Sequence, residues 1–584
     1  MSESPARTVL LLSLGVLTAA LYACAEPDGP VGTPGGHGDL ELRFVTPRMQ
    51  VVPVGSPRRL ELAVRLQRRL AEEETKPVPG ATLRIMQEKG TAAPLASRAT
   101  TDADGVASIA VEPSPSADRS EIVFVLEEDR RVFLSFGVVT APIIPVDLEP
   151  GEVDPEVDVP RAGALLRFRF QPGDEAILVP FQTDEDRGGM AYRFLYQGSN
   201  PREGSASFGL TPPDVSSSRP GSFGTGRGHV VTGEIEGGIR ASTRVAPSVN
   251  IRSCKVSVDR AAPLRYLGRR VALYVDAPRD RHQARIDSIG REFDESIYPA
   301  TTKIFGPTPD LDGNGVVIVV MTPELKDAGG AYCNGLQAAG VEALHTGWRT
   351  EEPIARTFGT LAHEHQHLVN AAHHLRTRGE SGDERWLNEA LSYAAEALQG
   401  YWNGPLTRIA KFLRWQNGGR PMLDLSFSSA FNGNYTLFAL YLGDRFGSGV
   451  YRRLGESGRV GVDNVEEATG TEFGTILRDW FLANALSDRG WTDDPRFRYR
   501  TVDLHGMAEE IAGCRCVPGG TLSGMNLESI RLDSPFDVFR SMFGLDADYY
   551  RLLPPEGEGG TFDVFVDPLL RPTTRFAVAR SPRR

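Results

Sequence analysis

The sequence lacks a long hydrophobic run and a cluster of basic residues. The mainly apolar stretch at residues 9–23 is shorter than the roughly 20 residues that a membrane-spanning helix needs, and no later run approaches that length. Lys and Arg number 64 against 76 Asp and Glu, for a formal net charge of -12. Because nucleic-acid binding requires clustered basic side chains to neutralise phosphates, we expect no nucleic-acid partner.

Cysteine is also scarce, with five in 584 residues. Cys254, Cys333, Cys514 and Cys516 follow an early Cys24. An exported protein can pair such cysteines, but their connectivity cannot be read from the sequence. The CxC formed by Cys514 and Cys516 has no second cysteine pair nearby, which argues against a zinc ribbon.

The N-terminus has the pattern of an export signal. Residues 9–23, VLLLSLGVLTAALYA, end just before Cys24, and LYAC resembles the cleavage box of bacterial lipoproteins. On this interpretation residues 1–23 are removed and a lipid on Cys24 anchors the protein to the bacterial cell envelope, at the outer membrane or cell surface. The alternative is an ordinary secretory signal that leaves Cys24 as a thiol. Residues 24–39 are rich in Gly and Pro and predict a flexible tether.

A chain of this length predicts several domains. Residues 40–145 show short alternating strands, and KPVPGATLRI followed by ATTDADGVASIAV resembles bacterial immunoglobulin-like domains, with a hairpin-type turn at residues 102–105. We therefore expect a multidomain protein whose parts are an immunoglobulin-like β-sandwich at 40–145, a second β-rich domain at 146–210, a linker at 211–262, an α+β domain at 263–492 and a β-rich C-terminal region at 493–584.

Histidine is rare except in one segment, ARTFGTLAHEHQHLVNAAHHLRTRG, which holds five of the ten histidines. HExxH on a helix places His363 and His367 one turn apart on one face, so that both imidazoles reach one metal ion. Glu364 lies beside them and can take a proton from an attacking water. The remaining positions are largely apolar, which favours a core helix with a functional polar stripe over a solvated histidine-rich helix.

A hydrolytic zinc site needs a third protein ligand, and two residues compete for the role. His373 fits the metzincin spacing HExxHxxGxxH, with Asn370 at the glycine position and Met422 as the nearby methionine. Glu389, in ERWLNEALSYAAE, would reach the ion from a second helix. We favour Glu389, because LVNAAHHLR continues as a helix without a breaker.

LAHEHQHLVN followed by WLNEALSYAAE resembles the hyicolysin-type family of secreted bacterial zinc peptidases. The resemblance extends over residues 266–486 and includes PDLDGNGVVIVV and NYTLFALYLGDRFG. It implies a zincin-like, gluzincin-type fold, zinc on His363, His367 and Glu389, Glu364 as the catalytic carboxylate, and a protein or peptide substrate. Tyr393 stands four residues after Glu389, where thermolysin-like enzymes have an Asp that orients a ligand histidine, so that orienting role has no candidate.

Transition-state stabilisation needs a donor that faces the developing oxyanion. Tyr435, which opens a predicted helix in FNGNYTLFALYL, is the candidate, although an aromatic at helical spacing also fits a core position. His374 and His345 are weaker alternatives.

A further possible metal site is a calcium ion near Asp310, Asp312 and Asn314. DLDGNG copies the first half of a calcium loop, but Met321 stands at the twelfth position, where an EF-hand has a bidentate Glu. A tight turn that leads into the strand VVIVVM is the alternative interpretation.

The sequence thus predicts an exported zinc metallopeptidase, acting as an endopeptidase, with β-sandwich modules between anchor and catalyst. One rival is a surface adhesin or binding lipoprotein whose zincin-like domain is inactive, and another is a protein with a purely structural metal. The intact Glu364 counts against both.

The lipid anchor predicts a simple change of location. Cys24→Ser should move the protein from the membrane fraction to the soluble fraction, because no other apolar stretch of the sequence is long enough to hold it. Fractionation followed by immunoblotting measures the shift. Retention of the variant in membranes would contradict lipidation at Cys24.

Overall fold

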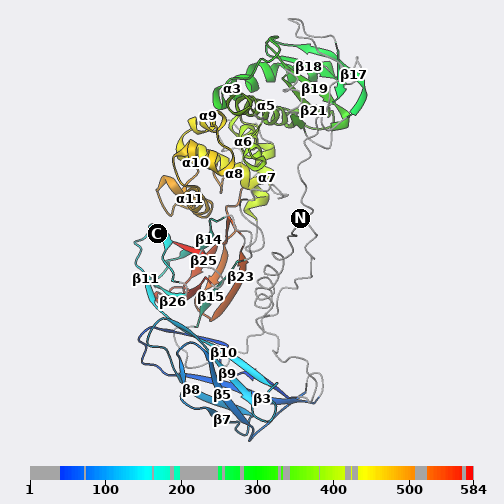
Figure 1. Ribbon diagram of the computed structural model, residues 1–584. Helices are drawn as coiled ribbons and strands as arrows, with labels where there is room; N and C mark the ends of the chain where they lie inside the picture. Colours follow the sequence, from blue (N-terminus) through cyan, green and yellow to red (C-terminus); the bar gives the residue numbers. More distant parts are fainter. Residues whose placement is uncertain are drawn as a thin grey trace, which may run out of the picture. The chain divides into compact units, whose positions relative to one another are not determined.

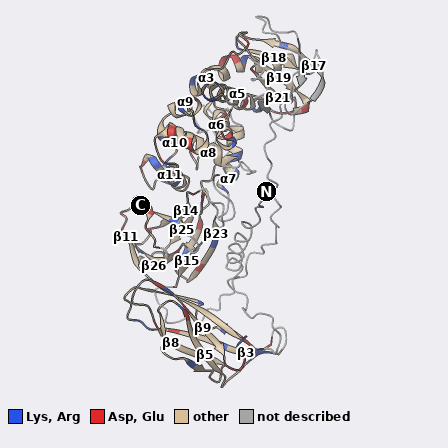
Figure 2. Cartoon of the chain, viewed as in Figure 1, with Lys and Arg blue, Asp and Glu red and all other residues tan. Residues whose placement is uncertain are grey.

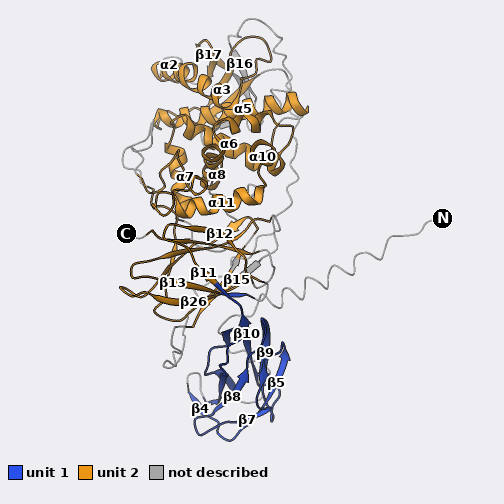
Figure 3. Ribbon diagram, turned by 90° about the vertical axis from the view of Figure 1, so that its left-hand side faces the viewer, with its two compact units in different colours: residues 1–144, 162–165, 199–224 blue, residues 145–161, 166–198, 225–584 orange. Residues whose placement is uncertain are grey.

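The computed structural model of the chain divides into two compact units (Figure 3). Unit 1 comprises residues 1–144, 162–165 and 199–224, and unit 2 comprises residues 145–161, 166–198 and 225–584. The described residues are 40–70, 74–160, 163–184, 190–197, 248–252, 257–276, 282–325, 330–332, 342–379, 382–414, 423, 432–506, 522–542, 544–568 and 574–582. The predicted signal, Cys24, the tether and the other four cysteines lie outside them.

Unit 1 contains two sheets that pack around one apolar core, with strand orders β1-β3-β8-β6, β4 pairing with β3, and β2-β10-β9-β5-β7. Its strands are β1 (Leu40–Phe44), β2 (Met49–Pro53), β3 (Leu60–Arg69), β4 (Thr75–Pro77), β5 (Thr82–Lys89), β6 (Ala93–Pro94), β7 (Arg98–Thr100), β8 (Val106–Glu112), β9 (Asp118–Leu126) and β10 (Phe133–Ala141). Along β8, Ala107, Ile109 and Val111 are buried in alternation, as a half-buried strand requires. The predicted β-rich N-terminal region is confirmed.

The turn expected at residues 102–105 is present, but it does not close a hairpin. The Asp102 carboxylate accepts hydrogen bonds from the N–H groups of Asp104 and Val106, both at 2.9 Å. β7 before the turn pairs with β5 in one sheet, whereas β8 after it pairs with β3 in the other. Gly105 has a φ of 72°, and a Cβ there would lie 2.5 Å from the Leu66 carbonyl oxygen. The chain therefore crosses between the sheets at a point where only glycine fits.

A second pair of sheets combines strands from two distant parts of the chain, in the orders β11-β13-β26-β15-β23 and β12-β27-β14-β25-β22, with β24 pairing with β14. The strands are β11 (Ile143–Val146), β12 (Val153–Val157), β13 (Ala164–Phe170), β14 (Ala176–Gln182), β15 (Met190–Tyr196), β22 (Glu528–Arg531), β23 (Phe536–Met542), β24 (Asp546–Ala547), β25 (Tyr550–Leu553), β26 (Gly560–Asp567) and β27 (Arg575–Arg580).

The sequence predicts two separate β-rich pieces here, at 146–210 and 493–584. In the structure they alternate within the same sheets, and fully buried aromatic rings from both pieces meet between the sheets. Phe194 of β15 lies edge-to-face with Tyr550 of β25 at 5.0 Å between ring centroids, and 5.9 Å from Phe576 of β27. Either piece alone would leave such rings in water, which explains why they form one structure.

The middle of the chain builds a mixed sheet of order β16-β17-β18-β19-β21-β20 (Figure 1). Its strands are β16 (Ser248–Arg252), β17 (Ser257–Leu267), β18 (Val271–Val275), β19 (Val317–Thr322), β20 (Gly330–Tyr332) and β21 (Ala343–Gly347). β18, β19 and β21 are parallel, and β17 and β20 are antiparallel to their neighbours. VALYV and VIVVMT are buried at every residue, as expected for central parallel strands. β16 and the start of β17 fall within the range 211–262 that was predicted as linker.

Helices pack on this sheet and continue beyond it. They are α2 (Gln283–Glu292), a π-helical segment (Phe293–Ile297), α3 (Tyr298–Phe305), α5 (Ile354–Arg378), α6 (Arg385–Leu398), α7 (Asn403–Leu413), α8 (Gly433–Phe446), α9 (Gly449–Glu456), α10 (Gly461–Thr469) and α11 (Phe473–Leu486), with short 3₁₀ turns at Pro323–Leu325 and Pro495–Phe497. Ile286 of α2 and Leu361 of α5 share an apolar core with β18 and β19, so these helices cover one face of the sheet. A larger apolar core joins α6–α11 to β14. In it, the ring centroids of Phe181 and Phe481 lie 6.4 Å apart.

Among the described residues, no helix is long and apolar enough to cross a membrane. Basic and acidic residues are interspersed along the same elements (Figure 2). In this view, no element among the described residues is coloured as basic along its whole length.

Candidate metal centre

The HEHQH segment lies in α5, a continuous helix of 25 residues. Pro353 is the residue before its first turn, and Gly379, with a φ of 76°, ends it by donating its N–H to the Leu375 carbonyl at 2.9 Å. Glycine is favoured at the second of these positions because it tolerates the left-handed conformation, and proline is tolerated at the first because its missing N–H interrupts no helical hydrogen bond there. The local sequence therefore defines the helix that carries His363 and His367 on one face.

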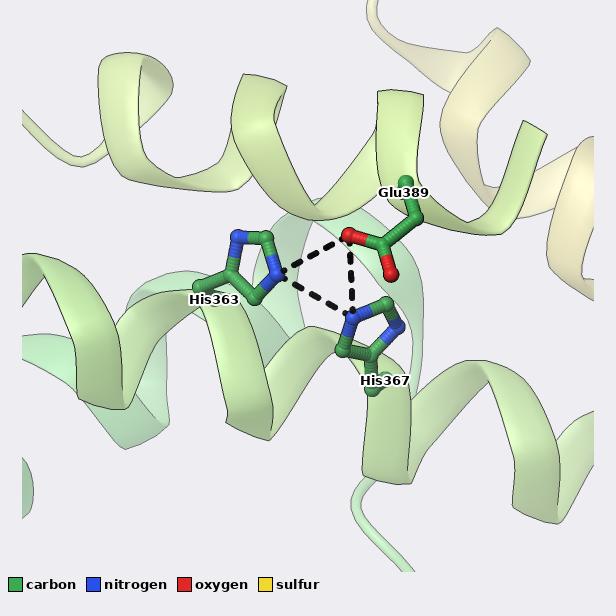
Figure 4. Close-up of side chains that lie close together, drawn as sticks. All are labelled: His363, His367 and Glu389. Carbon is green, nitrogen blue, oxygen red and sulfur yellow. Dashed lines mark hydrogen bonds and ion pairs between the residues drawn. The ribbon is translucent and has the colours of Figure 1, made fainter. Parts of the chain in front are cut away.

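Three side chains from two helices converge beside α5 (Figure 4). His363 Nε2 lies 3.1 Å from His367 Nε2 and 3.5 Å from Glu389 Oε2 of α6, and the distance from His367 Nε2 to Glu389 Oε2 is 3.9 Å. The three side chains are 12%, 9% and 22% exposed, so the centre is largely buried but not sealed.

These distances fit a single tetrahedral ion. Ligand atoms about 2.0–2.2 Å from zinc lie roughly 3.3–3.5 Å from one another in a tetrahedron, and the three separations here bracket that value. Two imidazoles with one carboxylate are also a donor set that suits zinc. Of the two candidate third ligands, the structure brings Glu389 into the group.

The charges around the centre favour a cation. Burial opposes charge on His363, but hydrogen bonds to Glu389 and Glu396 and the charge of Glu364 outweigh it and raise the pKa of His363 to about 10. Burial likewise opposes charge on Glu389, yet the hydrogen bond with His363 and the charge of His367 lower the pKa of Glu389 to about 2. Binding of a metal would replace the proton that this arrangement otherwise holds.

Glu396 orients the first histidine. Its Oε1 lies 3.1 Å from His363 Nδ1 and accepts a hydrogen bond from Arg408 at 2.5 Å. A proton on Nδ1 shared with this carboxylate leaves the Nε2 lone pair for the metal. The sequence pattern offers no candidate for this role at the position four residues after Glu389. Glu396 follows Glu389 by seven residues, two helical turns along the same face, and that spacing was the available signal.

Polar groups of α6 orient the second histidine. His367 Nδ1 lies 3.1 Å from Asn388 Oδ1 and 2.9 Å from Ser392 Oγ. The Ser392 hydroxyl also hydrogen-bonds to Gln366, and Asn388 Oδ1 accepts from Asn370 Nδ2 at 2.9 Å. Asn370 therefore ties α5 to α6 instead of breaking the helix.

Tyr393 packs against the centre. The centroid of its ring lies 4.8 Å from the centroid of the His363 ring. The Arg408 guanidinium, from α7, stacks on the Tyr393 ring with its central carbon 4.3 Å from the ring centroid. Asn432, just before α8, donates a hydrogen bond to its hydroxyl. Tyr393 stands where thermolysin-like enzymes have an orienting Asp, and here it holds the His363 ring in place by packing. Glu396 supplies the carboxylate that orients this histidine.

Glu364 is 5% exposed and lies close enough to His363 for its charge to raise the pKa of that histidine. It therefore lies near His363 and does not belong to the group of three donors.

His365, between the two candidate ligands, belongs to the opposite side of α5. Its ring stacks on Tyr298 at 5.4 Å and lies 5.1 Å from Phe293, and its Nε2 is 2.9 Å from the Thr308 hydroxyl. Burial lowers its pKa to about 3, so the ring is neutral. This histidine anchors α5 and is not positioned to bind the same ion.

His373 is remote from the two ligand histidines. It lies six residues beyond His367, about 9 Å further along the helix, and its Nδ1 is 2.8 Å from Arg376. The turn that the metzincin pattern needs at Asn370 is not made, because α5 continues to Arg378. Met422, the methionine of that alternative, lies outside the described residues.

The three candidate donors to the oxyanion are all buried. Tyr435 is 0% exposed and belongs to the apolar core of the helical half, so a substrate could not reach it in this conformation. His374 is fully buried, 3.6 Å from Asp383, and His345 of β21 is buried with its pKa lowered to about 4. The core interpretation of Tyr435 fits the structure better than the catalytic one.

No family model matches the chain. A curated relative, the neutral metalloprotease ShpI of Staphylococcus hyicus, is 28% identical over 206 residues, which cover 30% of this chain and 46% of the relative. The chain thus spans about half the length of the relative it matches. This distant similarity supports a relationship to metallopeptidases, and the structure supplies a group of residues that could hold the metal.

Proposed function

We propose that this chain is a zinc-dependent peptidase that cleaves protein or peptide substrates internally. The observation that carries the proposal is the convergence of His363 Nε2, His367 Nε2 and Glu389 Oε2 at separations suited to one tetrahedral ion. The distant similarity to a neutral metalloprotease supports the same activity.

When bound, zinc supplies Lewis-acid chemistry, lowering the pKa of a water ligand and polarising a carbonyl. Glu364, next to His363 but outside the ligand set, accepts the proton of the water that attacks the peptide carbonyl and passes it to the leaving amine. Glu396 and Asn388 hold the two imidazoles so that both Nε2 atoms face the ion. All the residues in this scheme belong to α5 or α6.

The edge of the mixed sheet offers a place for an extended substrate. β20 is the last strand of that sheet among the described residues and runs antiparallel to β21. An extended peptide can add to such an edge through main-chain hydrogen bonds, which suits an enzyme that acts on many sequences. We also propose export and a lipid on Cys24, for which the support is the sequence pattern alone.

The ligand assignment predicts different effects for Glu389 and His373. Glu389→Ala should weaken zinc binding by more than the roughly 10–100-fold that loss of an orienting partner costs, because it removes one of three donors. His373→Ala should leave the zinc content near one per chain. Inductively coupled plasma mass spectrometry after dialysis, with thermal unfolding as the check on folding, measures both. Normal zinc in Glu389→Ala together with loss in His373→Ala would refute the assignment.

The catalytic role predicts that Glu364→Gln abolishes hydrolysis without loss of the metal. The amide keeps the size of the side chain but cannot accept a proton, so kcat should fall by a factor on the order of a hundred or more, with KM near the wild-type value. Hydrolysis of casein and of a quenched fluorescent peptide library measures the effect.

Glu351→Gln, at an exposed glutamate just before the same helix, is the matched control and should keep wild-type activity. If the zinc-loaded wild type cleaves none of these substrates, and Glu364→Gln changes nothing, the chain is a binding protein with an inactive peptidase-like domain.

A further inference from the structure

A second group of acidic side chains lies at the N-terminal ends of the parallel strands β19 and β21. Asp310 and Asp312 belong to the loop between α3 and β19, and Glu342 immediately precedes β21. β19 and β21 are paired neighbours, and the Ile318 N–H donates to the Glu342 carbonyl at 3.0 Å. The sheet therefore brings together residues about thirty positions apart in the chain.

One carboxylate oxygen from each of Asp310, Asp312 and Glu342 lies within 4.8 Å of the others. Glu342 is only 1% exposed. Its Oε2 accepts the N–H of Leu311 at 2.9 Å, whereas its Oε1 is buried and makes no hydrogen bond among the described residues. A buried, unpaired carboxylate oxygen beside two further carboxylates is costly without a cation.

The charges that act on this group are negative. Burial raises the pKa of Glu342 to about 7, and the Asp312 and Asp310 carboxylates add to the increase against the effect of the Leu311 N–H. No Lys or Arg within the described ranges forms an ion pair with any of the three. Only a proton on Glu342 or a bound cation can therefore compensate the negative charge of this group.

The structure changes the ligand set that the loop sequence suggested. Asn314 does not offer its carbonyl oxygen, because Oδ1 accepts the Val316 N–H at 2.7 Å and Nδ2 donates to Asp312 at 2.7 Å. Glu342 takes its place from the neighbouring strand. A local motif could not reveal this, since the third carboxylate arrives through the pairing of β19 with β21.

We propose that Asp310, Asp312 and Glu342 bind a structural calcium ion. All three donors are hard carboxylate oxygens without an imidazole or thiolate, which favours Ca²⁺ over zinc. Asp310 is exposed and Asp312 is half-buried, so water can complete the six to eight oxygen ligands that calcium takes. The small, strictly octahedral Mg²⁺ would fit three carboxylates from two flexible segments less well.

The proposed ion would also support α5. The same loop carries Thr308, whose hydroxyl lies 2.9 Å from His365 Nε2, and Gly306, where a Cβ would lie 2.7 Å from His373 Nε2. A calcium ion that ties Asp310 and Asp312 to Glu342 fixes the far end of a loop that packs on the back of the HEHQH helix. This role is independent of whether the chain hydrolyses peptides.

Calcium titration of the full chain, zinc-loaded and in the Glu364→Gln background to prevent self-digestion, tests the proposal. Calorimetry should find one calcium site, and thermal unfolding should shift upward by about 3–6 °C at a calcium concentration roughly ten times the Kd. The same concentration of Mg²⁺ should give a smaller shift. Zinc content, measured in parallel, should stay constant.

Glu342→Gln and Asp312→Asn separate metal binding from a purely structural role. Both should lose the calcium-dependent shift, and Glu342→Gln should unfold in calcium-free buffer at the wild-type temperature or above it, because it removes a buried charge that repels its neighbours. Asp493→Asn, at a fully exposed carboxylate, is the matched control and should keep the shift. An absent calcium shift in the parent, an equal response to Mg²⁺, or a full shift retained in Glu342→Gln would overturn the proposal.

Discussion

The packing of α6 against α5 is the constraint on which the candidate metal centre depends. α5 supplies two imidazoles, and α6 supplies the third donor together with the groups that orient both rings. Fully buried Ser392 of α6 hydrogen-bonds to Gln366 of α5, and the bond between Asn370 and Asn388 fixes the register of the two helices. A slip of α6 by one turn, about 5.4 Å, would remove every one of these contacts at once. The same interface thus sets both the stability of the core and the chemistry of the site.

Buried carboxylates occur in both candidate metal sites, the one around His363 and the one around Glu342. The side chains that surround these carboxylates differ between the two sites. Near His363, Glu389 and Glu396 face two imidazoles and Arg408, so the site combines nitrogen and oxygen donors as zinc prefers. Around Glu342, the candidate ligands among the described residues are three carboxylates, which suit a harder ion. Burial of these carboxylates costs free energy in the absence of a cation, because charge in a low-dielectric interior must be compensated. One mixed sheet and its helices would then hold two metals of different chemistry.

Much of the site could be predicted because its determinants are local. HExxH at helical spacing predicts His363 and His367 on one face. The absence of a breaker after Asn370 favours Glu389 over His373 as third ligand, and the structure places a Glu389 oxygen within 4.8 Å of both histidine nitrogens. Two other features depend on pairing between strands that are distant in the sequence, which no local pattern specifies. One is the position of Glu342 beside Asp310 and Asp312, and the other is the pair of sheets that the two β-rich pieces share. Tyr435 was ambiguous for a related reason: helical spacing alone does not tell whether an aromatic side chain faces a core or a cleft.

The central claim is that one zinc ion is held by two residues of α5 and one of α6. A crystal structure of the zinc-loaded chain, with anomalous data on both sides of the zinc absorption edge, tests it most directly. The account predicts one strong zinc peak about 2.0–2.2 Å from His363 Nε2, His367 Nε2 and a Glu389 carboxylate oxygen. A zinc peak at His373 or at a cysteine, with His363, His367 and Glu389 hydrogen-bonded only to protein groups, would contradict it.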